Sequence, residues 1–202
     1  DLTASDDGIN AAGGNDNSGF GGPRGDAFGS ASSSSYIKIT GGTVYVNADG
    51  DGVDSNGSLE VSGGSLFVSG PTSNGDGALD FDGNGIISAG TVIAVGSSGM
   101  AQNFGTSSTQ GSALISVGNR NASDKVTLTD EKGNVLAEYE PEKAYSTVVI
   151  SCPAMKQGGT YTVSAGDFSE TFTLTSLIYG GGAPNGGDRP NGGRPGGGGF
   201  GR

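Results

Sequence analysis

Short apolar strands recur along the first half of the chain, and three of them are led by glycine. Alternation of apolar and polar positions predicts strands at 36–39, 42–46, 58–61, 64–68 and 90–95. The leading glycines Gly42, Gly64 and Gly90 are separated by 22 and 26 residues. Repeats of this length, with glycine corners where a positive φ is cheap, are typical of the coils of a parallel β-solenoid.

The second half has a different pattern, because glycine thins out and longer alternating strands appear. A strand at 113–117 is assigned to the coils, and five more belong to a separate sheet. They are predicted at 125–129, 134–139, 145–150, 160–163 and 170–174. We expect this small antiparallel sheet to pack across the end of the solenoid, where unpaired backbone has to be covered.

These patterns predict an all-β chain in three parts. Residues 1–120 form parallel coils, interrupted by a Gly/Ser-rich insertion at 13–35, and residues 121–178 form the antiparallel cap. Residues 180–202 are a tail rich in Gly, Pro and Arg, with 12 glycines in 23 residues. Such a tail cannot bury a core.

Charge is concentrated in the coils. The chain has a net charge of −11, and residues 1–120 carry 12 acidic and 3 basic groups against 9 and 7 in residues 121–202. Nucleic acid and anionic membrane surfaces both require clustered Lys and Arg, so neither is an expected partner. No apolar run is long enough to predict membrane insertion.

Acidic turns recur with the coils, at Asp7-Gly8, Asp51-Gly52 and Asp76-Gly77. The last two are 25 residues apart, so we expect them to stack at about the 4.8 Å spacing of neighbouring strands. Stacked carboxylates without local Lys or Arg favour a hard cation such as calcium, which prefers six to eight oxygen ligands. The alternative is that Asp-Gly simply forms good turns. The candidate metal ligands are Asp7, Asn10, Asp49, Asp51, Asp54, Asp76 and Asp80.

Two aromatic residues, Tyr45 and Phe67, are 22 residues apart and should form a ladder on successive coils. Outward-facing rings on a solenoid can stack on sugar rings. The alternative is that they pack under a loop or against the cap. They are the candidate carbohydrate-binding residues.

Catalysis is not expected. A polysaccharide lyase needs a Lys or Arg base, and Lys38 is the only lysine in the coils. A glycoside hydrolase needs carboxylates at a defined separation, but here metal binding already explains them. Cys152 has no histidine partner anywhere in the chain and is expected to be a buried apolar residue.

The acidic turns carry a resemblance to a known family. The segments SDDGINAAGGND (5–16), ITGGTVYVNADGDGVDSNG (39–57), GPTSNGDGALDFDG (70–83) and GSSGMAQ (96–102) resemble successive coils of the carbohydrate-binding domain-containing proteins of clostridia and other Gram-positive bacteria. The resemblance covers most of residues 1–178. Proteins of this family normally carry further coils before this point.

The resemblance implies a right-handed, pectate-lyase-like parallel β-helix with bound calcium at Asp7, Asp51, Asp54, Asp76 and Asp80. It also implies an extracellular or cell-surface location and affinity for plant cell-wall polysaccharides of the cellulose and pectin class, without established catalysis. The expected function is therefore non-catalytic polysaccharide binding. The alternative is a structural subunit of an extracellular filament, in which copies of the chain assemble through an open solenoid end and the tail.

Overall fold

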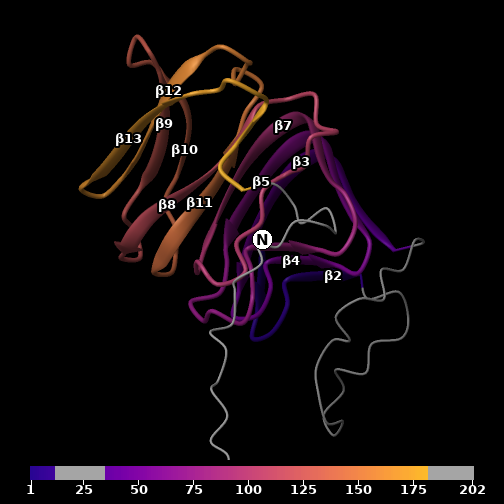
Figure 1. Cartoon of the computed structure of the whole chain (residues 1–202). Helices are drawn as coiled ribbons and strands as arrows, with labels where there is room; N and C mark the ends of the chain where they lie inside the picture. The colour runs from indigo at the N-terminus through magenta and orange to yellow at the C-terminus, as the bar shows by residue number, and fades with distance from the viewer. Residues whose placement is uncertain (12–34, 182–202) are drawn as a thin grey trace, which may run out of the picture.

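The computed structural model describes residues 1–11 and 35–181, and in these ranges the chain is all-β, with fourteen strands and no helix (Figure 1). Consequently, no described helix is long and apolar enough to cross a membrane. Most of the predicted insertion and tail lies outside the described residues. The strands are β1 (Leu2–Ala4), β2 (Ile9–Ala11), β3 (Tyr36–Ala48), β4 (Val53–Ser55), β5 (Ser58–Ser69), β6 (Leu79–Phe81), β7 (Gly85–Gly96), β8 (Ser112–Arg120), β9 (Val126–Asp130), β10 (Val135–Tyr139), β11 (Tyr145–Ser151), β12 (Thr160–Ala165), β13 (Phe168–Thr173) and β14 (Ile178–Tyr179).

The first seven strands pair in parallel and form parts of two sheets. Strands β1, β3, β5 and β7 are neighbours in a seven-stranded sheet, and β2, β4 and β6 form a three-stranded sheet. Val46 lies between Leu2 and Val68 in the first sheet. Val53 lies between Ile9 and Leu79 in the second. The predicted repeat of short parallel strands is thus confirmed at the level of strand pairing.

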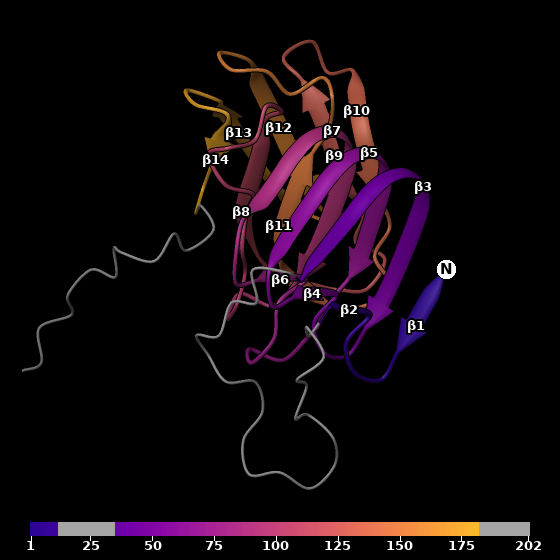
Figure 2. The ribbon, with the colours of Figure 1, turned by 90° about the vertical axis from the view of Figure 1, so that its right-hand side faces the viewer.

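The predicted glycine corners are also confirmed. Gly42, Gly64 and Gly90 have φ values of 75°, 79° and 96°, in the region that only glycine adopts cheaply. We predicted two short strands on either side of Gly42 and two more on either side of Gly64. In the structure each such pair is a single strand, β3 or β5, that bends at the glycine. Figure 2 shows β3, β5 and β7 side by side as three strongly bent strands.

The concave side of these bent strands encloses the first apolar core. Alternation along each strand supplies its residues, as in β3, where Ile37 and Ile39 are buried and Lys38 between them is exposed. The core is completed by Phe81 of β6 and by Phe104, both fully buried. Its largest buried members are Leu59, Leu66, Leu79, Phe81, Ile87 and Phe104.

Parallel pairing of successive coils ends at β7, although the short strand β14 later pairs with β8 in parallel. Strand β11 pairs with β7 in antiparallel orientation, and β8 then pairs with β11. The strand predicted at 145–150, which we assigned to the antiparallel cap, therefore belongs to the seven-stranded sheet as β11, beside β8. Periodicity alone could not show this, since a strand from 145–151 inserts between two earlier ones.

The remaining sheet, in the order β10-β9-β12-β13, is antiparallel, as predicted. We expected this sheet to lie across an open end of the coils, but it does not. It packs against the outer face of the seven-stranded sheet, where Ile93, Val148 and Ile150 share one core with Leu128 and Val163. Neighbouring residues of the same strands, such as Ala94 and Val149, face the first core instead. Strands β7 and β11 are therefore buried on both faces.

Candidate functional site

Three aspartates converge at the acidic turns. Asp7 lies between β1 and β2, Asp51 lies between β3 and β4, and Asp54 belongs to β4. One carboxylate oxygen from each lies within 4.8 Å of the other two. Asp51 and Asp54 are only 8% and 6% exposed, so these charges are held away from water. The cluster could hold a metal ion.

Hydrogen bonds from these carboxylates connect one turn to the next. Asp7 Oδ1 accepts a hydrogen bond of 2.9 Å from the backbone N–H of Asp51. Asp51 Oδ1 in turn accepts one of 2.5 Å from the backbone N–H of Gly77. Asn10 Nδ2 donates to Asp7 Oδ2 at 2.8 Å. Asp7 and Asp51 therefore each bridge to the following turn through a backbone N–H.

A second polar row runs beside the cluster. Asn10, Asp54 and Asp80 occupy matching positions on β2, β4 and β6. Gln102 Nε2 extends the row by donating to Asp80 Oδ1 at 3.2 Å. Sequence reasoning did not select Gln102, since it lies in an irregular loop without strand periodicity.

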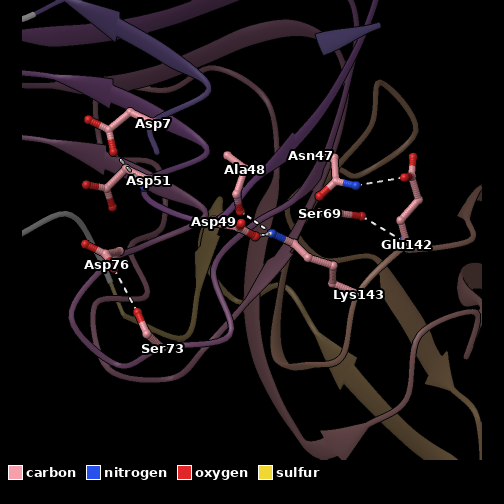
Figure 3. A network of polar contacts seen from close by, with 10 residues as sticks. All are labelled: Asp7, Asn47, Ala48, Asp49, Asp51, Ser69, Ser73, Asp76, Glu142 and Lys143. Atoms are coloured by element: carbon pink, nitrogen blue, oxygen red, sulfur yellow. Dashed lines mark hydrogen bonds and ion pairs between the residues drawn. The ribbon is translucent and has the colours of Figure 1, made fainter. Parts of the chain in front are cut away.

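Two of the predicted ligands lie elsewhere. Asp76 accepts a hydrogen bond from Ser73 Oγ at 2.8 Å and is not part of the three-aspartate cluster (Figure 3). Asp49 forms an ion pair with Lys143 at 3.1 Å and has a side chain that is 70% exposed. Lys143 comes from the loop before β11, so a segment distant in the sequence supplies the basic partner of this acidic turn.

A one-residue offset explains the position of Asp76. Val53 pairs with Leu79, so the residue opposite Asp51 is Gly77, not Asp76. The predicted stacking of Asp51 on Asp76 at a 25-residue spacing therefore misses the observed register by one residue. The Asp54–Asp80 match, which has the same 26-residue spacing as Val53 and Leu79, is kept.

Burial and like charge act together on Asp51. Desolvation raises the pKa of its carboxyl from 3.8 to about 7, opposed by the hydrogen bond from Gly77 and supported by repulsion from Asp80, Asp7 and Asp54. In the absence of a cation, this carboxyl therefore holds its proton up to near neutral pH. A bound cation would favour the charged form instead.

This shift predicts an unusual pH dependence in the presence of a chelator. Between the unfolded pKa near 4 and the folded pKa near 7, the folded state binds the extra proton, so its stability falls as pH rises through this window. We expect the free energy of unfolding to drop by on the order of 2–4 kcal/mol from about pH 4 to about pH 8. Urea titrations at several pH values measure it, and Asp51→Asn should flatten the slope. Equal slopes in both proteins would contradict this interpretation.

The predicted aromatic ladder is present. Tyr45 and Phe67 occupy paired positions on β3 and β5, and their rings stack with centroids 5.0 Å apart at 18°. A third ring, Tyr139 at the end of β10, stacks on Phe67 at 5.2 Å. Both alternatives therefore apply in part. The rings pack against Tyr139 of the antiparallel sheet, and Tyr45 is still 41% exposed. Sequence reasoning missed Tyr139, which is far from the repeats in the chain.

The three rings border a cavity of about 280 Å³ between the coils and the antiparallel sheet. Its other lining residues are Lys125, Glu138 and Glu140. Lys125 and Glu138 form an ion pair at 3.3 Å, and both side chains are about half exposed. The cavity is thus lined half by aromatic rings and half by charged side chains.

The loop that follows β10 fixes this cavity to the coils. Ser69 Oγ lies 2.8 Å from the hydroxyl of Tyr139 and accepts a hydrogen bond of 2.9 Å from the backbone N–H of Glu142. Asn47 Nδ2 donates to Glu142 Oε2 at 2.8 Å, and Lys143 also contacts the carbonyl of Ala48 (Figure 3). The position of Tyr139 relative to the coils is therefore set by several polar contacts.

Cys152 is buried, as expected, and burial raises the pKa of its thiol. Arg189, Arg194 and Arg202, which we considered as partners for acidic coils of another copy, lie outside the described residues.

No family model, curated protein or solved structure matches this chain. The function proposed below therefore rests on the geometry of the described residues and on the resemblance at the acidic turns.

Proposed function

We propose that this chain is a non-catalytic, extracellular or cell-surface polysaccharide-binding protein. The observation that carries the proposal is the cluster of Tyr45, Phe67 and Tyr139 beside a cavity of about 280 Å³. Aromatic rings present flat apolar faces that match the C–H faces of sugar rings, and the tyrosine hydroxyls can hydrogen-bond at the edge. Plant cell-wall polysaccharides of the cellulose and pectin class are the proposed ligands.

The scaffold proposed for this role is the end of a right-handed parallel β-helix. Matching positions recur on three successive coils, such as Ile9, Val53 and Leu79, and support this interpretation. So does the continuous core inside the bent strands. The antiparallel strand β11, pairing with β7, then ends the stack of coils.

Calcium is the proposed ion for the three-aspartate cluster. Its donors are hard carboxylate oxygens without sulfur or nitrogen, which suits calcium or magnesium better than zinc or copper. Asp7, Asp51 and Asp54 would hold the ion, with Asp80 adding negative charge beside them. Bound there, calcium would neutralise the carboxylates and connect neighbouring turns, a structural role.

Absence of catalysis is part of the proposal. Of the two carboxylates that line the cavity, Glu138 is exposed and paired with Lys125. Incubation with cell-wall polysaccharides should release no reducing ends and no unsaturated product.

Binding is tested by affinity electrophoresis through gels that contain single polysaccharides. Wild-type protein should be retarded by at least one cell-wall polysaccharide, and Tyr45→Ala should lose most of that retardation. Tyr36→Ala is the matched control, because Tyr36 is an exposed tyrosine on the same strand, 69% exposed, outside the cavity. Wild-type migration that is unchanged in every gel would contradict the proposal.

A filament subunit is the second candidate function. In the described part of the chain, β1 and β2 are edge strands of their sheets and belong to the same coil. Both therefore offer backbone groups for pairing with a further strand at one end of the stack. Negative-stain microscopy distinguishes the candidates: uniform fibres would favour assembly, and separate particles at high protein concentration would exclude it.

A further inference from the structure

We propose that the aromatic cavity selects neutral sugar chains over chains of uronic acids. This inference rests on the proposed polysaccharide-binding function and narrows its ligand from the cellulose and pectin class to neutral glucans. It follows from the charged residues that line the cavity, all of which lie outside the sequence repeats.

The neutral part of the cavity is the ring surface. The three centroids form a compact triangle, with Tyr45 and Tyr139 6.5 Å apart and Phe67 stacked on both. At about 280 Å³ the space is slightly below the range of drug-sized ligand sites, roughly 300–1,000 Å³. It therefore suits a short stretch of a sugar chain resting on Tyr45, the most exposed of the three rings.

The charged part of the cavity is acidic. Glu138 and Glu140 line it, and the single cation there, Lys125, is already paired with Glu138 at 3.3 Å. Glu142 lies two residues further along and is held against Asn47 on β3. A uronic acid brings one carboxylate per sugar, which these glutamates repel. The hydroxyl groups of a neutral sugar instead donate hydrogen bonds, and carboxylates accept them well.

The arrangement is fixed before any ligand arrives. The Tyr139 hydroxyl is hydrogen-bonded to Ser69, and the loop 140–143 is held to β3 and β5 through Asn47, Ser69 and Asp49. These contacts therefore hold Tyr139 and the backbone that carries Glu140 in place beside the other two rings. Preorganisation of this kind favours affinity for the ligand that fits and discrimination against the one that does not.

Calorimetric titration with two oligosaccharides of equal length tests the inference. Cellopentaose supplies a neutral chain, and pentagalacturonate supplies a uronic acid chain too short to gel with calcium. With the calcium concentration held constant, the wild-type protein should bind cellopentaose at least tenfold more tightly than pentagalacturonate. Glu140→Gln should raise pentagalacturonate affinity several-fold and so narrow the preference for cellopentaose, because glutamine keeps a carbonyl acceptor for a sugar hydroxyl but carries no charge. That gain should be largest at low salt, where charge repulsion is least screened.

The outcomes separate this inference from the function it rests on. Equal or tighter binding of pentagalacturonate, lost in Tyr45→Ala, would overturn the selectivity and leave the aromatic binding site standing. Binding of neither oligosaccharide, together with no retardation in any polysaccharide gel, would overturn both. Unchanged cellopentaose affinity in Tyr45→Ala, with Tyr36→Ala as control, would place any binding outside the cavity and also overturn the inference.

Discussion

Calcium added to the chelator-treated protein is expected to raise its melting temperature by about 5–10 °C. An ion that binds only the folded state, at about 100 times its dissociation constant, contributes about 2.7 kcal/mol. For a chain of this length, each kcal/mol corresponds to roughly 2–4 °C. The ion removes the repulsion among Asp7, Asp51 and Asp54, which are otherwise held close together in a largely buried site. Differential scanning fluorimetry measures the shift.

Two substitutions sharpen this experiment. Asp51→Asn keeps the shape of the side chain and an acceptor for the Gly77 N–H but removes one charge from the cluster, so the calcium response should fall by more than half. Asp76→Asn removes the same charge outside the cluster and should respond like the wild type. A wild-type melting temperature indifferent to calcium, or equal loss in both variants, would contradict the assigned site.

Replacement of Gly52 by alanine is expected to destabilise the protein by about 2–4 kcal/mol. A Cβ at Gly52 would lie 2.4 Å from the carbonyl oxygen of Ala78 and 2.4 Å from Val68 Cγ1. The backbone oxygen belongs to the neighbouring turn, so relief requires the two turns to separate. That separation would also disturb the contact between Asp51 and Gly77. Urea unfolding, followed by circular dichroism, measures the loss.

Gly41→Ala provides the control for this prediction. Gly41 is exposed on β3, and a Cβ there would meet no atom within 4 Å. Its stability should change by less than about 0.5 kcal/mol. Similar losses for both variants would show that the close approach of the turns at Gly52 is not what the alanine disturbs.

The strands and corners of the coils could be predicted because their causes are local. The alternation Ile37-Lys38-Ile39 and the positive φ of Gly42 and Gly64 depend on the nearest neighbours in the chain. The all-β class and the paired positions of Tyr45 and Phe67 followed from the same periodicity.

Features that depend on distant segments could not be predicted in this way. Insertion of β11 between β7 and β8 is decided by packing on both faces of β11, where Val148 and Val149 point into different cores. Tyr139 reaches the aromatic ladder, and Lys143 reaches Asp49, only through the sheet order.

The acidic site was predicted in part, for a related reason. Asp7, Asp51 and Asp54 come together as expected, because strand register places them on adjacent turns. Asp76 does not join them, because one more residue separates Asp76 from Asp80 than separates Asp51 from Asp54. Pairing of β4 with β6 aligns Asp54 with Asp80, so the extra residue displaces Asp76 and places Gly77 opposite Asp51.

The most direct test of the account is a nuclear magnetic resonance titration of the isotope-labelled, calcium-loaded protein with cellopentaose. We expect saturable shift changes concentrated at Tyr45, Phe67 and Tyr139 and at the neighbouring Glu138 and Glu140, with Tyr36 unaffected. Absence of shifts at the three rings at saturating ligand, or shifts confined to another surface, would contradict it.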